Sequence, residues 1–276
     1  MVDANERDLM IHHEKVALIT GASSGIGAEF ARQLASRGFS LVLVARREER
    51  LASLALELVN TYGVQAEVLP ADLSTDNGVA RVEERIASLA NLELLVNNAG
   101  HGISGRFHKV ELEKHLTLVQ VHAIASMRLV RAALPGMVER KRGGIINVAS
   151  MAAIIQLVNP TYCAAKSFLV GFSRALQNDI LDSGVKVQAL CPGFTYSEFH
   201  DSPEYTGFQR RQLPRFLWQT AEAVVAESLK SLERGKVICI PGRRYRFFAW
   251  LAGSPITAPL FRWIARHILR RHSKNR

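Results

Sequence analysis

Short apolar runs alternate along the chain with longer amphipathic stretches. The runs span five or six residues, and several are apolar at every position, which predicts strands buried on both faces. We expect seven strands, at 16–20, 40–44, 64–69, 92–96, 144–149, 185–190 and 236–240. The amphipathic stretches predict helices at 25–37, 48–61, 76–89, 110–137, 160–181 and 221–232. Regular alternation of strand and helix is typical of α/β proteins, so we expect a doubly wound, seven-stranded parallel sheet with helices on both faces.

Length and composition favour one large domain. The chain has 276 residues, 48% of them hydrophobic, and no long linker or internal repeat divides it. We expect a single domain over 1–276, with a core of about 14–243 and a C-terminal extension over 244–276. The three cysteines lie far apart in apolar contexts, which predicts reduced, buried thiols and no metal site. The polar start has no apolar segment typical of a signal peptide, so a reducing, cytoplasmic location is expected.

The excess positive charge is concentrated near the C-terminus. The formal net charge is +10, but eleven of the 35 Lys and Arg lie from Arg234 onward, where Asp and Glu are absent. The preceding 24 basic and 25 acidic side chains nearly cancel, so the charge belongs to a basic tail. No aromatic stacking platform or recognition motif accompanies these arginines, so nucleic-acid binding is not expected.

The tail combines this charge with apolar residues. An uncharged segment at 247–261 is interrupted by Gly and Pro and is too short to span a membrane. From Leu260 onward, a helix would set Arg262, Arg266 and Arg270 on one side and apolar residues on the other. This pattern fits a membrane surface, another subunit of a homodimer or homotetramer, or the rim of a pocket in the same chain.

A glycine-rich segment, ITGASSGIG, follows the first predicted strand and opens the first predicted helix. In this position Gly21 allows a tight turn, Gly25 lets the backbone approach a pyrophosphate, and Gly27 lets the helix pack on the strand. The helix N-terminus adds N–H donors and a positive dipole end. The segment therefore predicts a dinucleotide-binding loop. We expect its contacts to come from Gly21, Ser23, Ser24, Gly25, Ile26 and Gly27.

The end of the second predicted strand indicates which dinucleotide is bound. An Asp or Glu at this place would bind the ribose 2′-hydroxyl of NAD, but this chain has Arg46 and Arg47. A carboxylate repels a 2′-phosphate, whereas a guanidinium binds it in fork geometry. We therefore expect NADP(H), with both arginines near the 2′-phosphate. The alternative is that these arginines are only solvated.

Two further motifs end the third and fourth predicted strands, at Asp72 and Leu73 and at the NNAG segment 97–100. Both lie at the carboxyl edge of the sheet, where open α/β sheets bind ligands. Asp72 can accept a hydrogen bond from the adenine amine, and a small-residue loop lets the ribose approach the backbone. We expect cofactor contacts here from Asp72, Leu73, Asn98, Ala99 and Gly100.

Candidate acid–base chemistry follows the fifth predicted strand. Tyr162 and Lys166 are four residues apart in a predicted helix, so their polar ends point to the same place. A free tyrosine titrates near pH 10, about three units above neutrality, and needs a nearby positive charge to favour phenolate. Ser150 ends the strand twelve residues before Tyr162 and can orient a substrate carbonyl that Tyr162 protonates. We expect Lys166 to tune the tyrosine and to reach the cofactor ribose.

These motifs occur together and in order. The chain has T-G-x-x-x-G-x-G at 20–27, N-N-A-G at 97–100, a serine ending the fifth strand, Tyr-x-x-x-Lys at 162–166 and Pro-Gly at 192–193. Over about residues 14–243 it resembles the short-chain dehydrogenase/reductase family, and five ordered motifs make the resemblance specific.

The resemblance implies a Rossmann-type fold and a hydride-transfer enzyme. It implies Ser150, Tyr162 and Lys166 as catalytic residues, with the last two also contacting the cofactor. It further implies cofactor contacts from Pro192, Gly193 and Thr195, the last of these at the nicotinamide carboxamide.

Two departures from the family pattern change the picture. The family usually has an asparagine in the long helix before the fifth strand, where it helps hold a water in a proton relay, but this chain has His122 there. Histidine can donate and accept hydrogen bonds and keep the relay, which makes His122 a further candidate catalytic residue; a packed helix residue is the equal alternative. The loop from Ser150 to Tyr162 is also one residue shorter than usual, which affects the substrate pocket more than the chemistry.

The segment 194–218 follows the sixth predicted strand, where this family builds a loop over the substrate. Its aromatic residues predict an apolar pocket wall. They are Phe194, Tyr196, Phe199, Phe208, Phe216 and Trp218. We therefore expect an NADP-dependent oxidoreductase acting on a carbonyl or secondary alcohol of a lipid-derived, steroid-like or aromatic substrate. The alternative is a sensor or scaffold that binds NADPH with little or no turnover.

Overall fold

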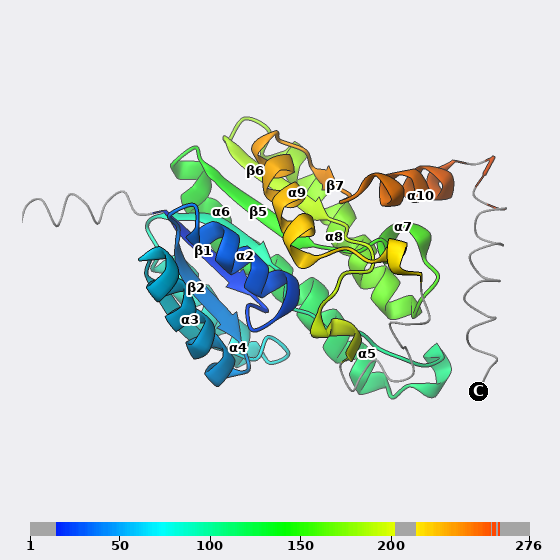
Figure 1. The fold of residues 1–276 in the computed structure, drawn as a ribbon, viewed down its shortest axis with the longest axis horizontal. Helices are drawn as coiled ribbons and strands as arrows, with labels where there is room; N and C mark the ends of the chain where they lie inside the picture. Colours follow the sequence, from blue (N-terminus) through cyan, green and yellow to red (C-terminus); the bar gives the residue numbers. More distant parts are fainter. Residues whose placement is uncertain (1–14, 202–213, 255, 258, 260–276) are drawn as a thin grey trace, which may run out of the picture.

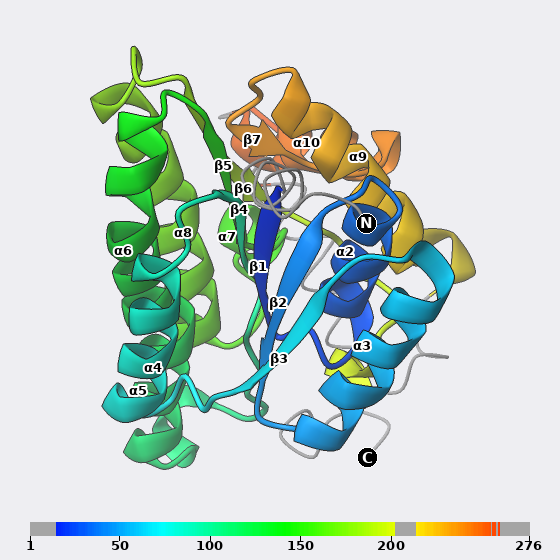
Figure 2. The same ribbon diagram turned by 90° about the vertical axis from the view of Figure 1, so that its left-hand side faces the viewer.

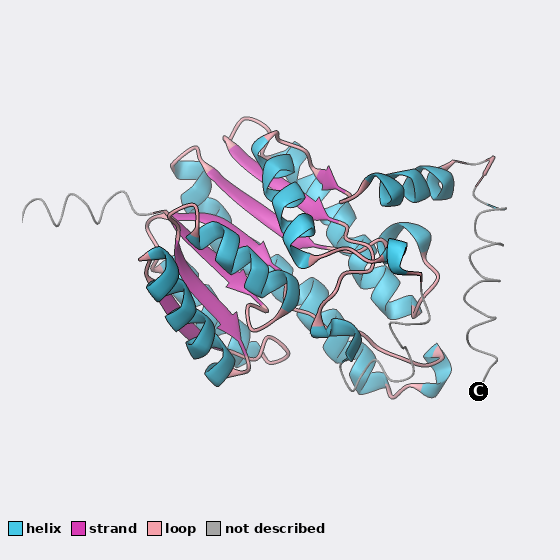
Figure 3. Ribbon diagram, viewed as in Figure 1, coloured by secondary structure: helices cyan, strands magenta, loops and turns pink. Residues whose placement is uncertain are grey.

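The structure is a computed structural model that describes residues 15–201, 214–254, 256–257 and 259. Within these residues, seven strands form one sheet in the order β3-β2-β1-β4-β5-β6-β7. The strands are β1 (Val16–Thr20), β2 (Ser40–Ala45), β3 (Ala66–Pro70), β4 (Leu92–Asn97), β5 (Gly143–Val148), β6 (Val185–Leu190) and β7 (Ile238–Cys239). Every neighbouring pair is parallel, as Figures 1 and 3 show, so the predicted sheet is confirmed.

Helices cover both faces of the sheet. The first set lies on one face and consists of α2 (Gly25–Ala35), α3 (Glu48–Tyr62) and α9 (Ala221–Glu233). The second set lies on the opposite face (Figure 2) and consists of α4 (Asp76–Ala87), α5 (Leu112–Val119), α6 (Ser126–Glu139) and α8 (Pro160–Asp179). Short helices of three or four residues are η1 (Phe107–Lys109), α7 (Ala152–Ile155), η3 (Glu198–Asp201) and η6 (Arg215–Leu217), and α10 (Arg243–Gly253) is the last described helix.

Continuous apolar strands are required because the sheet is buried on both sides. In β1, all five residues are buried. Ala17 and Ile19 pack into the core under α2 and α3, whereas Leu18 packs into the core under α4 and α6. This alternation follows from the two-residue period of a strand. The Rossmann-type α/β fold expected from the sequence is therefore confirmed.

The long helix predicted at 110–137 is not continuous. The structure has α5, then a π-helical turn η2 (Gln120–Ala125), then α6. A π-helical turn adds a residue to the turn and often marks a functional site, and sequence periodicity does not reveal it. The turn contains His122, whose ring lies where a side chain at Gly100 would be: a Cβ there would be 2.2 Å from His122 Cε1.

The C-terminal region contains a helix that the sequence analysis did not predict. Helix α10 begins beside β7 and carries the buried Tyr245, whose ring fills the space next to Gly193. In the sequence of this helix, the apolar and basic residues do not recur with a clear helical period, so the helix was not predicted. The predicted basic helix from Leu260 onward lies outside the described residues. In the part of the chain that is described, no helix is both long and apolar enough to cross a membrane.

The switch in strand order lies between β1 and β4. From β1 the chain builds outward to β2 and β3, and from β4 it builds outward in the opposite direction to β7. Loops at the carboxyl ends of these two strands therefore diverge and leave room for a ligand. The glycine-rich loop follows β1 and the NNAG segment follows β4, so both predicted cofactor motifs meet at this point.

Candidate active site

The glycine-rich loop and the NNAG loop are joined by hydrogen bonds. Thr20 Oγ1 accepts from the backbone N–H groups of Asn98 at 2.9 Å and Ala99 at 3.0 Å. The Asn98 side-chain amide donates to the carbonyl oxygens of Thr20 and Gly21 at 3.0 and 3.2 Å. Thr20 was not predicted as a site residue, although it begins the glycine motif. Its role is to hold the two loops together.

The glycines are required by the geometry of this loop. Gly21 and Gly25 have φ values of +67° and +56°, in the left-handed region that other residues rarely adopt. A Cβ on Gly27 would lie 2.2 Å from the Gly21 carbonyl oxygen. Glycine thus lets the loop pack tightly at the N-terminus of α2, where helix N–H groups can bind a diphosphate, and these residues fit a dinucleotide.

A group of polar residues that we call the phosphate end lies beside this loop and consists of Ser23, Ser24, Arg47, Arg50 and Glu198. Arg47 donates to Ser23 Oγ at 2.9 Å and to Ser24 Oγ at 3.1 Å. Its other terminal nitrogen donates to Glu198 at 3.0 Å, and Arg50 donates to both oxygens of the same carboxylate at 2.5 and 2.6 Å.

This arrangement separates the two predicted arginines. Arg47 reaches the glycine-rich loop, whereas Arg46 is exposed and makes no hydrogen bond or ion pair with any described residue. Sequence reasoning missed Arg50 and Glu198. Arg50 lies three residues after Arg47 in the first turn of α3, a spacing that places both on one helix face and could have indicated it.

The predicted adenine contacts are positioned by a turn after β3. Asp72 Oδ1 accepts from the Ser74 backbone N–H at 3.0 Å, which leaves the second carboxylate oxygen for other partners. Leu73 is 6% exposed and packs into the core under α4, so only its backbone can face the cofactor. Gly100 makes room for the ring of His122.

The three predicted catalytic side chains come from β5 and α8. Asn159 caps α8 by accepting from the Thr161 and Tyr162 N–H groups, which fixes the start of the helix beside the end of β5. Ser150 follows β5, and its Oγ accepts from the Ala152 N–H at 3.1 Å. Lys166 is 4% exposed, and its Nζ lies 5.7 Å from the centre of the Tyr162 ring. The spacing of tyrosine and lysine places both groups together, as predicted.

Burial controls the protonation of Lys166. Its Nζ donates to the Val148 carbonyl oxygen at 2.6 Å, and among the described residues no acidic side chain forms an ion pair with it. Burial lowers the pKa of Lys166 to about 7, because an ammonium loses hydration in the interior. The lysine therefore changes charge close to neutral pH in this structure.

His122 lies in the same buried part of the site. We call the group formed by Ser150, Tyr162, Lys166 and His122 the catalytic end. The Nε2 atom of His122 lies 3.0 Å from the His101 N–H and 2.9 Å from the His101 carbonyl oxygen. Its ring meets the Tyr162 ring edge-on, with the centres 5.7 Å apart. Burial first, and then the charge of Lys166, holds the pKa of His122 well below its usual value, so the imidazole is neutral.

The loop after β6 forms the other wall of the site. The carbonyl of Pro192 accepts from the Met151 N–H at 2.9 Å, and the buried Thr195 donates to the Gly193 carbonyl at 3.1 Å. Tyr245 of α10 accepts from the Phe194 N–H at 2.9 Å and donates to the Leu217 carbonyl, so it fixes this loop at two points. Sequence reasoning missed Tyr245.

Aromatic side chains line the same loop. Tyr196 stacks on Trp218 with the ring centres 5.0 Å apart, and Phe194 packs against Trp218 at 5.6 Å. Phe199 lies 6.0 Å from Tyr162, ring centre to ring centre. Half of the predicted aromatic wall thus anchors the loop, and Phe199 faces Tyr162. Phe208 lies outside the described residues.

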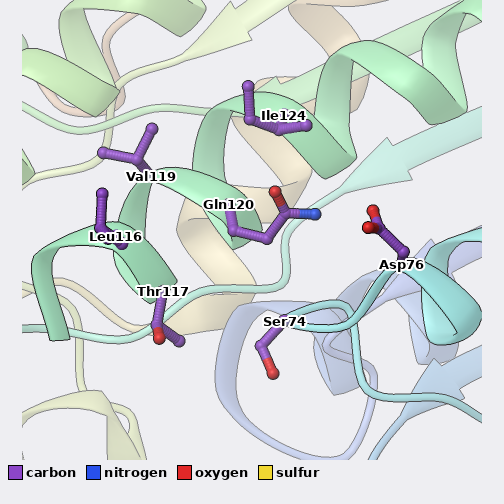
Figure 4. A pocket seen from close by; sticks show the side chains of 7 residues that line it. All are labelled: Ser74, Asp76, Leu116, Thr117, Val119, Gln120 and Ile124. Carbon is purple, nitrogen blue, oxygen red and sulfur yellow. The ribbon is translucent and has the colours of Figure 1, made fainter. Parts of the chain in front are cut away.

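A separate pocket opens beside the start of α4, away from the catalytic end. It has a volume of about 410 Å³ and is open to solvent. Figure 4 shows its lining: Ser74, Asp76, Leu116, Thr117, Val119, Gln120 and Ile124. None of the four residues predicted to be catalytic, Ser150, Tyr162, Lys166 and His122, lines this pocket.

With this geometry established, comparison with known proteins identifies the family. The family model for short chain dehydrogenases matches residues 15–204. The chain belongs to this family of nucleotide-binding oxidoreductases, so the resemblance inferred from the five motifs is confirmed.

Individual relatives have different names and lengths. The chain is 36% identical over 202 residues to the very-long-chain 3-oxoacyl-CoA reductase of Mycosarcoma maydis, covering 70% of this chain and 56% of the relative. It is 33% identical over 192 residues to the inactive hydroxysteroid dehydrogenase-like protein 1 of Homo sapiens, covering 67% and 57%. The chain thus spans a little over half the length of these two relatives.

A similar solved structure is the short-chain dehydrogenase from Sphingobium yanoikuyae in complex with NADPH. The TM-score is 0.78 and the identity is 34%, with 86% of this chain and 92% of the other covered. The fold expected from the sequence is therefore shared with a solved enzyme of the family.

Proposed function

We propose that this protein is an NADP(H)-dependent oxidoreductase acting on a carbonyl or secondary alcohol of an apolar substrate. The observation that carries the proposal is the catalytic end, where the ring of Tyr162 contacts both the buried Lys166 and the ring of His122. A protein that only binds a nucleotide does not need a tyrosine beside a buried lysine whose ammonium contacts the end of β5, two residues before Ser150. When bound, NADP(H) supplies the hydride in reduction or accepts it in oxidation.

Each catalytic side chain has a separate task in the reduction. Ser150 Oγ already accepts from the Ala152 N–H, so its own hydrogen remains to donate to the substrate oxygen. Tyr162 gives its phenolic proton to the same oxygen as negative charge develops there. The Lys166 ammonium has one N–H directed to Val148, which leaves two donors for a ribose hydroxyl and a proton relay. Its positive charge stabilises the phenolate that remains.

The preference for NADP(H) is supported by the phosphate end. Arg47 lies within hydrogen-bond distance of both serines of the glycine-rich loop, where it can grip a 2′-phosphate. No carboxylate stands at the end of β2 to bind a ribose hydroxyl. The similar Sphingobium structure binds NADPH, which is in keeping with this choice.

The apolar substrate class is supported by the loop after β6. Phe199 approaches the catalytic tyrosine, and Tyr196 and Trp218 form a stacked pair nearby. The 3-oxoacyl-CoA reductase among the relatives is named for a carbonyl on a long apolar chain.

The test is NADPH consumption against a panel of apolar ketones and aldehydes, with Tyr162→Phe as the matched blank. Turnover restricted to small charged substrates would contradict the proposed class.

A second candidate function is a sensor or scaffold that binds NADPH without turnover. It is favoured by the relative named as inactive and by His122 at the position where the family usually has asparagine. Tight NADPH binding with no turnover on any carbonyl of the panel would support it over the enzyme.

Assembly and location complete the proposal. We propose a homodimer or homotetramer, because the outer surface of α5 to α6 exposes several large apolar side chains. They are Leu112, Leu116, Ile124 and Met127. Analytical ultracentrifugation tests this oligomeric state, and a monomer at all concentrations would contradict it.

For the basic C-terminal segment, we propose peripheral membrane contact of a cytoplasmic protein. Co-sedimentation with anionic liposomes, before and after truncation at Arg244, tests this contact.

A further inference from the structure

The phosphate end already holds an anion that belongs to the protein. The carboxylate of Glu198 receives hydrogen bonds from Arg47 and Arg50, while Arg47 also donates to Ser23 and Ser24. Two guanidinium groups thus bind one carboxylate, and two hydroxyls lie on the other terminal nitrogen of Arg47; these are groups that can bind a phosphate monoester. Hydrogen bonds from Arg50 and then Arg47 lower the pKa of Glu198, so the group is ionised at neutral pH.

The backbone delivers Glu198 to this position from both sides. The preceding residue, Ser197, packs against the glycine-rich loop so closely that a Cβ on Gly25 would lie 2.8 Å from Ser197 Cβ. The following residue, Phe199, packs against the ring of Tyr162. One short segment therefore contacts the dinucleotide loop, the phosphate end and the catalytic tyrosine, and its carboxylate is held in place rather than free to move in solvent.

We propose that Glu198 is a specificity-determining residue that occupies the 2′-phosphate site formed by Arg47 and Arg50 and competes with the cofactor for it. This rests on the proposed NADP(H) function and adds Arg50 as a phosphate ligand. NADPH has a 2′-phosphate that replaces the carboxylate on the two arginines. NADH has no such group and leaves Glu198 in place, so the competition acts on NADPH binding alone.

The expected effect is modest because these side chains are about half exposed, with 44% for Arg47, 48% for Arg50 and 49% for Glu198. Exposed ion pairs contribute about 0.2–1 kcal/mol, which corresponds to an affinity change of up to about fivefold. Glu198→Gln therefore tightens NADPH binding by about two- to fivefold and leaves NADH binding unchanged. Arg50→Ala removes a phosphate ligand and weakens NADPH binding, again with little effect on NADH.

The experiment measures the dissociation constants of NADPH and NADH by cofactor fluorescence for the wild type, Glu198→Gln, Arg50→Ala and Arg47→Ala. Glu57→Gln is the matched control, because Glu57 forms a similar exposed pair with Arg32 away from the cofactor loops. Unchanged NADPH affinity in Glu198→Gln, with a loss in Arg47→Ala, would overturn the competition and leave the proposed function intact. Unchanged NADPH affinity in both arginine variants would instead contradict the NADP(H) preference itself.

Discussion

The catalytic end and the phosphate end hold charge in opposite ways. Lys166 and His122 are 4% and 1% exposed, and the Nδ1 atom of His122 is buried without a hydrogen-bond partner among the described residues. At the phosphate end, the charged groups are about half exposed, and each has an oppositely charged partner. At the catalytic end, loss of hydration therefore determines which side chains are protonated. At the phosphate end, the charged side chains stay hydrated and pair with a group of opposite charge. The first arrangement suits proton transfer, and the second suits exchange of one anion for another.

Among the variants that compare the charged groups of the two ends, the largest effect is expected from removing the buried charge of Lys166. Lys166→Met keeps a long apolar side chain but removes the ammonium, so the phenolate of Tyr162 loses its stabilising charge. We expect the turnover number to fall by about 10²–10⁴-fold, the range for loss of acid–base assistance. Steady-state kinetics at saturating NADPH measures this. A loss of less than tenfold would show that Lys166 is not needed to tune the tyrosine.

The variant Lys166→Met also tests whether burial is the cause of the lowered pKa of Lys166. The unfolded lysine keeps its proton up to pH 10.5, whereas the folded one releases it at about 7. Between these values the unfolded state binds more protons, so stability rises with pH. Relative to Lys166→Met, the wild type gains on the order of 2 kcal/mol from pH 7 to pH 9. Urea unfolding at both pH values measures the difference, and a constant difference would mean that the ammonium stays hydrated.

Arg47 and Arg46 allow a direct test at the phosphate end. Arg47 contacts the glycine-rich loop and Arg46 does not, so Arg47→Ala should weaken NADPH binding by about 10–100-fold, as expected for charged hydrogen bonds. Arg46→Ala should cause a clearly smaller loss. Equal losses in the two variants, measured by cofactor fluorescence, would show that both arginines bind the phosphate. If Arg46→Ala causes no loss, only Arg47 of the two arginines expected from the sequence binds the phosphate.

The smallest effect is expected at His122. An asparagine keeps a hydrogen-bond donor and an acceptor at this position, so His122→Asn should change turnover by less than about fivefold. His122→Ala removes the contacts of Nε2 with the N–H and carbonyl of His101 and should lower the free energy of unfolding by about 1–3 kcal/mol. Turnover at several pH values, with urea unfolding of both variants, separates the roles. If His122→Asn restores stability but not turnover, histidine is needed in the relay itself.

The sequence predicted those parts of the protein that depend on local pattern. All seven strands were found because a doubly covered sheet requires uninterrupted apolar runs, and Tyr162 and Lys166 were found because helix geometry fixes their spacing. The π-helical turn η2 was missed because it depends on the packing of His122 against Gly100. Glu198 was missed for a similar reason, since only the fold brings the loop after β6 to the start of α3.

The most direct test of the proposed chemistry compares the wild type with Tyr162→Phe. Phenylalanine keeps the ring that packs against His122 and Phe199 and removes only the hydroxyl. We predict that turnover of apolar ketones falls by at least about 10³-fold while the dissociation constant of NADPH stays within a factor of about two. Turnover that persists in Tyr162→Phe, with NADPH bound as in the wild type, would contradict the assignment of Tyr162 as the proton donor.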